Sequence, residues 1–108
     1  MDEFFRNGFE AAKSIVDTEG ATIEFPINDV DAENVESFID GAIQLFEDRL
    51  HAIAGIRYST EFKTMVESFA GWDGGKSKYH GIPVAFDSSF WPKAKIEIVA
   101  GPRVVGNG

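Results

Sequence analysis

Three stretches of the chain place apolar residues at the three- and four-residue spacing of a helix that buries one side. The longest stretch follows Asp31, whose carboxylate can cap the free N–H groups of a first helical turn. Helices are therefore expected over about residues 2–18, 32–55 and 60–70. The apolar stripe of the longest helix is expected to contain Val35, Phe38, Ile39, Ala42, Phe46, Leu50 and Ile53.

Three shorter stretches alternate apolar and polar residues, which is typical of half-buried strands. The first contains Pro26, which has no N–H to donate and therefore favours a sheet edge or the end of a strand. The other two are separated by a turn and are expected to pair as an antiparallel hairpin. Residues 72–78 contain adjacent glycines and few apolar side chains, which indicates a loop. Strands are expected over about residues 21–27, 82–86 and 96–100.

Size and composition limit the fold to one unit. The chain has 108 residues, of which 44% are hydrophobic, and it contains no cysteine. These values fit a single domain over residues 1–108 and exclude disulfides and thiolate metal sites. With the predicted elements they indicate the α+β class, in which two or three helices pack on a small, mainly antiparallel β-sheet.

Charge is distributed unevenly along the chain, whose formal net charge is −8. Residues 1–72 contain 15 acidic and 5 basic residues, whereas residues 73–108 contain 3 acidic and 5 basic residues. No basic residue lies between Lys13 and Arg49. The pattern predicts an acidic pole and a weakly basic pole that carries aromatic residues.

The chain contains no motif that supports catalysis. No serine lies in a nucleophile elbow, and most acids occupy positions expected to face water. Asp87 is the exception, but it is expected to cap the Ser88-Ser89 turn. Gly75-Lys76-Ser77 lacks the earlier glycine and the strand-to-helix context of a phosphate loop. We therefore expect no enzyme, no catalytic residue and no cofactor.

Two histidines raise the question of a metal site. Glu47 and His51 are four residues apart, which would place them on one face of the predicted helix. A metal ion would also need His80 as a third ligand. A Glu–His pair at this spacing is equally explained as a surface contact, so we expect no metal site.

The acids of the long helix are expected to form a solvated face that binds a partner. Five acids between residues 33 and 48 span roughly 22 Å, or one charge per about 4 to 5 Å, whereas duplex DNA carries one per about 1.7 Å. One helix alone therefore falls short of imitating DNA, and a face that only keeps the protein soluble is the alternative. The candidate partner-binding residues on this face are Glu36, Asp40, Glu47 and Asp48.

Aromatic residues at the predicted turns form a second candidate surface. Trp72, Tyr79 and Trp91 lie within or beside turns, where burial in a core is less certain than on a periodic face. Aromatic side chains of this kind dominate the binding energy of protein interfaces. Direct binding of nucleic acid is not expected, because the basic half has a net charge of only +2 and the rest of the chain is strongly acidic.

Residues 79–98 contain Tyr79-His80-Gly81-Ile82-Pro83-Val84-Ala85-Phe86-Asp87, a turn, and the strand Lys95-Ile96-Glu97-Ile98. This segment resembles a cassette of small bacteriophage-encoded proteins and, more loosely, strands of phage virion proteins. The resemblance covers about twenty residues and implies a viral or prophage origin. Short acidic proteins of this kind often act by binding a host protein.

These features together predict a non-catalytic acidic binding protein, such as a phage accessory factor or inhibitor. Its expected partner is a protein, for example a basic or DNA-binding host protein, engaged through the acidic helical face or the aromatic turns. The alternative is a self-assembling structural component of a virion or prophage. The acidic start and the lack of a long apolar run predict a cytoplasmic protein without a membrane span, and its oligomeric state is left open.

Overall fold

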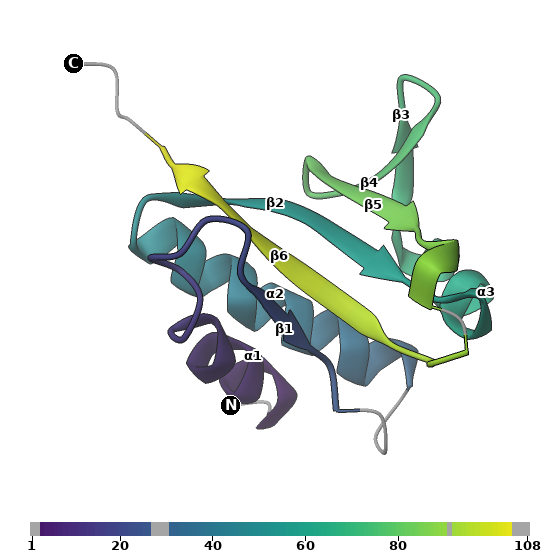
Figure 1. The fold of residues 1–108 in the computed structure, drawn as a ribbon, viewed down its shortest axis with the longest axis horizontal. Coiled ribbons are helices and arrows are strands. Elements are labelled where there is room, and N and C mark those ends of the chain that lie inside the picture. Colours follow the sequence, from purple (N-terminus) through teal and green to yellow (C-terminus); the bar gives the residue numbers. More distant parts are fainter. Residues whose placement is uncertain (1–2, 27–30, 91, 105–108) are drawn as a thin grey trace.

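The computed structural model describes residues 3–26, 31–90 and 92–104. Its elements are α1 (Glu3–Ala12), β1 (Thr22–Glu24), α2 (Ala32–Asp48), β2 (His51–Tyr58), the 3₁₀ turn η2 (Thr60–Phe62), α3 (Lys63–Phe69), β3 (Gly71–Asp73), β4 (Lys76–Tyr79), β5 (Ile82–Phe86), the 3₁₀ turn η3 (Ser88–Phe90) and β6 (Ile96–Arg103). The strands form one sheet in the order β1-β6-β2-β5-β4-β3, in which β2 and β5 are parallel and the other neighbours are antiparallel. Helices α1 and α2 cover one face of this sheet (Figure 1). The predicted α+β class is confirmed.

Helices α1 and α2 pack against each other at two glycines. A Cβ atom on Gly8 would lie 1.9 Å from the carbonyl oxygen of Phe38, and one on Gly41 would lie 1.9 Å from the carbonyl oxygen of Phe5. Only glycine allows two backbones to approach this closely. Gly8 therefore has a packing role that offsets its unfavourable helix propensity.

The long helix ends earlier than its apolar spacing predicts. Asp31 caps it as expected and accepts a hydrogen bond from the N–H of Glu33 at 2.9 Å. The predicted extension over residues 49–55 is wrong, because Leu50 adopts a left-handed φ of 57° and His51 begins β2. Register shifts in β2 reproduce the helix-like spacing of Ile53 and Ile56, and both side chains are buried.

The expected hairpin between residues 82–86 and 96–100 is also wrong. Strand β2 lies between β5 and β6 and bonds to both. Ile56 pairs with Val84 of β5 in parallel and with Ile98 of β6 in antiparallel register. Alternation identified the strands and their buried faces, but it carries no information on which strands are neighbours.

The expected loop over residues 72–78 is instead a hairpin. Strands β3 and β4 pair with Trp72 opposite Ser77, and Gly74 and Gly75 form the turn with φ values of 60° and 82°. Two successive positive φ angles suit the right-handed twist of paired strands. Figure 1 shows this hairpin extending away from α1 and α2.

The other predicted elements occur with shifted ends. The first helix ends at Ala12, and the third begins as the turn η2 before α3. Ser59 makes no side-chain bond to that turn and instead accepts from the N–H of Lys95 at 2.9 Å. Strand β1 pairs only with β6 and lies at a sheet edge, as Pro26 predicted.

Candidate functional site

A groove follows the outer surface of α2 between α1 and the β4–β5 turn. It consists of three adjoining pockets, of about 390, 280 and 230 Å³. Phe5 and Gln44 are shared by the first two pockets, and Ile43, Glu47 and His80 by the last two. We call this surface the α2 groove and define it by Phe5, Phe9, Asp40, Ile43, Gln44, Glu47, His51 and His80.

The carboxylates of α2 give the groove its charge. None of the five acidic side chains of this helix forms an ion pair with a described residue. Asp48 accepts a hydrogen bond from Gln44 Nε2 at 2.8 Å, whereas Glu47 is exposed and has no side-chain partner in the described part of the chain. Glu47 is therefore an uncompensated negative charge beside apolar side chains.

Glu36 and Asp40 are not the solvated acids that the helical pattern predicted. Both are half-buried, because the hydroxyl of Tyr79 is directed at them. Tyr79 Oη lies 2.5 Å from Asp40 Oδ1 and 3.0 Å from Glu36 Oε2, so one phenol proton serves two carboxylates. Burial, together with hydrogen bonds to Asp40 and Glu36, raises the pKa of Tyr79 well above its ordinary value.

Tyr79 is buried, although the sequence placed it among the candidate surface aromatic residues. Its side chain is 5% exposed, and its ring packs edge-on against Phe69 with centroids 5.5 Å apart. The residue therefore joins β4 to α2 and α3, and its hydroxyl reaches the edge of the acidic surface from inside. Its role is to position the hairpin against α2.

The β4–β5 turn that borders the groove contains a strained histidine. His80 and Gly81 have φ values of 50° and 82°, which form a tight hairpin turn. A left-handed φ is uncommon for a residue with a Cβ atom, and such outliers cluster at functional sites. The His80 ring lies against Tyr79, with centroids 4.3 Å apart, and lines two of the three pockets.

The groove brings together Glu47, His51 and His80, the residues that a metal site would require. His51 is on β2 and not on the helix with Glu47, so the expected helical spacing is wrong. His51 Nε2 lies 3.9 Å from Asp17 Oδ1, and its Nδ1 is buried without a hydrogen-bond partner in the described residues. No group of three or more His, Asp or Glu side chains in the described ranges could hold a metal ion.

The candidate aromatic surface includes two tryptophans. Trp72 on β3 is 69% exposed, which fits its predicted place on the surface. Trp91 lies outside the described residues. Trp72 lines none of the three pockets of the α2 groove, so the two candidate surfaces are distinct.

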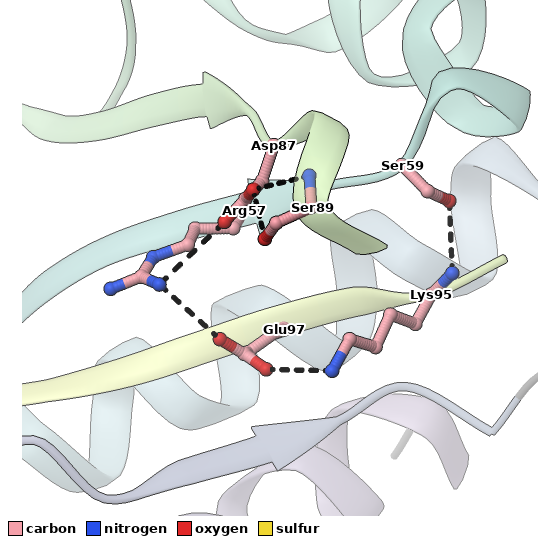
Figure 2. A network of polar contacts seen from close by, with 6 residues as sticks. All are labelled: Arg57, Ser59, Asp87, Ser89, Lys95 and Glu97. Atoms are coloured by element: carbon pink, nitrogen blue, oxygen red, sulfur yellow. Dashed lines mark hydrogen bonds and ion pairs between the residues drawn. The ribbon is translucent and has the colours of Figure 1, made fainter. Parts of the chain in front are cut away.

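A polar network lies where β2 and β6 meet the turn η3 (Figure 2). Arg57 Nη1 is 3.7 Å from Asp87 Oδ2 and 4.0 Å from Glu97 Oε1, and Lys95 Nζ is 3.4 Å from Glu97 Oε2. Two cationic and two anionic groups thus balance each other. We assign this network to holding η3 on the sheet, because it leaves no net charge for a ligand.

Asp87 caps its turn as the sequence predicted. The hydroxyl and the N–H of Ser89 both donate to Asp87 Oδ1, at 2.6 and 2.9 Å. These hydrogen bonds, with Arg57 and Lys95 nearby, hold the pKa of Asp87 below its ordinary value. A lowered pKa favours a structural carboxylate over a general acid.

Comparison with protein-family models, curated proteins and solved structures finds no match to this chain. The resemblance of residues 79–98 to phage proteins therefore stays a prediction. No helix in the described ranges has the length and apolar content needed to cross a membrane.

Proposed function

We propose that this chain is a non-catalytic binding protein whose α2 groove takes up a basic segment of a protein partner. The observation that carries the proposal is the exposed Glu47 carboxylate without a cationic partner, set in a concave surface with apolar walls. A partner that supplies a lysine or arginine at this point gains a charge-assisted contact without displacing an existing ion pair.

The walls of the groove suit the binding of a peptide segment better than the imitation of a DNA backbone. Phe5 and Ile43 border the same pocket as Asp40 and Glu47, so apolar and acidic groups alternate over a short distance. Asp40 and Glu36 already accept hydrogen bonds from Tyr79 and are half-buried, so they are less available than Glu47 to a regular row of exposed charges. An amphipathic segment with basic and apolar side chains matches this surface better than a DNA-binding cleft does.

The test is a titration of the labelled protein with two short blocked peptides, one alternating lysine with leucine and one alternating glutamate with leucine, followed by NMR. We expect the lysine peptide to shift the amide signals of Glu47 and His80, and we expect binding to weaken steeply between about 20 mM and about 500 mM salt, because exposed charges are screened. Glu47→Gln should weaken binding about two- to fivefold, the range of one exposed ion pair.

Glu19→Gln is the matched control for this experiment. Glu19 is exposed, lines none of the three pockets, and its substitution changes the net charge by the same amount. Equal losses in the two variants, or equal binding of the lysine and glutamate peptides, would show that the groove is not a cation-selective site. Binding that is independent of salt would also reject the proposal.

A further inference from the structure

The middle pocket of the α2 groove combines two flat rings with acidic side chains. It has a volume of about 280 Å³ and shares residues with both neighbouring pockets. Its ring-bearing residues come from the two borders of the groove, Phe5 from α1 and His80 from the β4–β5 turn. The rest of its lining lies on one stripe of α2, at the spacing i, i+3, i+4 and i+7, and consists of Asp40, Ile43, Gln44 and Glu47.

Glu47 supplies the charge that this pocket offers to a ligand. Asp40 already accepts a hydrogen bond from the buried Tyr79. Glu47 is exposed and has no side-chain partner in the described part of the chain. A cation that enters the pocket therefore pairs with Glu47.

The imidazole of His80 is held in place before any ligand binds. Its ring packs edge-on against the buried Tyr79, with centroids 4.3 Å apart and ring planes at 65°. The backbone of His80 has a φ of 50°, where asparagine or glycine is the more usual residue of such a turn. A ring fixed in this way loses little conformational entropy when a flat ligand stacks on it.

A flat cation suits this lining better than a compact one. The guanidinium of arginine is planar and weakly hydrated, so its faces stack on rings while its N–H edge donates to a carboxylate. The ammonium of lysine is a compact charge that holds its water strongly, and the rings and Ile43 cannot replace that water. Two rings and a carboxylate in one pocket therefore favour guanidinium over ammonium.

We propose that the α2 groove selects arginine over lysine, with the guanidinium of the partner stacked on the rings of His80 and Phe5 and hydrogen-bonded to Glu47. This inference rests on the function proposed above and specifies the basic side chain that the groove takes up. Glu47 determines whether a basic segment binds, and the two rings determine which basic residue that segment carries.

The test compares the lysine–leucine peptide with a peptide of the same length in which arginine replaces every lysine. At about 20 mM salt and neutral pH we expect the arginine peptide to bind about three- to tenfold more tightly, since each exposed ring contact contributes a few-fold. His80→Asn removes one ring and keeps a residue that tolerates the left-handed turn, and Phe5→Leu removes the other ring and stays apolar. Each variant should lower the preference for arginine by about two- to threefold and leave the affinity for the lysine peptide within about twofold.

Phe9→Leu is the matched control, because Phe9 lines the neighbouring pocket of about 390 Å³ and not this one. It should keep the preference for arginine. Glu47→Gln should weaken the binding of both peptides by a similar factor, since its carboxylate pairs with either cation. His80→Asn changes an exposed side chain, so it decides the outcome if Phe5→Leu is unstable.

Two kinds of result separate this inference from the function on which it rests. Equal affinity of wild type for the two peptides would overturn the inference and leave the proposed function intact. A preference for arginine that survives in both ring variants, or that falls equally in Phe9→Leu, would do the same. Failure of both basic peptides to bind would reject the proposed function and this inference together.

Discussion

Replacing Tyr79 by phenylalanine tests the contact that joins the hairpin to the acidic helix. The change removes one hydroxyl and keeps the buried ring, whose packing against Phe69 needs no oxygen. Asp40 and Glu36 lose the hydrogen bonds from the Tyr79 hydroxyl, so water must solvate both carboxylates instead. A hydrogen bond to a charged group contributes about 1.5–3 kcal/mol, and water reaches these half-buried carboxylates. We expect Tyr79→Phe to lower the free energy of unfolding by about 1–2 kcal/mol at neutral pH.

The dependence on pH gives this prediction a second, independent readout. Burial, with hydrogen bonds to Asp40 and Glu36, raises the pKa of Tyr79 above its ordinary value of 10.0. The folded protein therefore holds a proton that the unfolded chain loses near pH 10. The stabilisation is fully present below pH 10 and decreases above it, by up to about 1.4 kcal/mol per pH unit. The stability of the phenylalanine variant does not have this decrease, so the difference in free energy of unfolding between the two proteins should shrink as the pH rises.

Urea unfolding of both proteins between pH 7 and about pH 11.5 measures this difference. Tyr58, whose pKa is also raised by burial, titrates in both proteins and cancels in the comparison. In Tyr58→Phe, Tyr79 is the remaining tyrosine of the two in the chain, so tyrosinate absorbance reports on it directly. A stability difference below about 0.5 kcal/mol at neutral pH, or one that does not shrink above pH 10, would refute the argument.

Two further substitutions test the packing and the turn that hold the site. Gly41→Ala places a Cβ atom 1.9 Å from the Phe5 carbonyl oxygen, so we expect the free energy of unfolding to fall by about 1–3 kcal/mol. The exposed control Gln44→Ala should lower it by less than about 0.5 kcal/mol. Equal stability of the two variants would disprove the close helix contact. Asp87→Ala removes the acceptor of two Ser89 hydrogen bonds and should lower the thermal midpoint at neutral pH. Because the pKa of Asp87 is lowered in the fold, the difference in thermal midpoint should be present at pH values above 3.8, the ordinary pKa of this group, and should disappear as the pH falls further. A difference that does not change with pH would contradict the assignment.

Local patterns predicted the features that depend on neighbouring residues. The cap at Asp31, the turn at Asp87 and the edge position of β1 follow from side-chain chemistry within a few residues. The end of α2 could not be predicted in this way, since the spacing from Phe46 to Ile53 continues the helical stripe. The competing state, a central strand bonded on both sides, depends on partners in β5 and β6.

The candidate site also combines features that the sequence predicted with features that depend on distant segments. Glu47 and Asp48 are exposed as the helical pattern predicted, and Trp72 is exposed on its hairpin. Glu36 and Asp40 were expected to face water, but Tyr79 reaches them from 43 and 39 residues away. The groove could not be found from the sequence either, because α1, α2 and the β4–β5 turn enclose it jointly.

By itself, the sequence determined the α+β class, the polarity of charge along the chain and the faces that its helices and strands bury. These properties follow from spacing and composition, which act over one or two turns of backbone. Only the tertiary structure decided that β2 separates β5 from β6, that two glycines bring α1 against α2, and that a tyrosine engages the acidic helix. Each depends on a contact between distant segments, whose gain is realised only when the whole chain is packed.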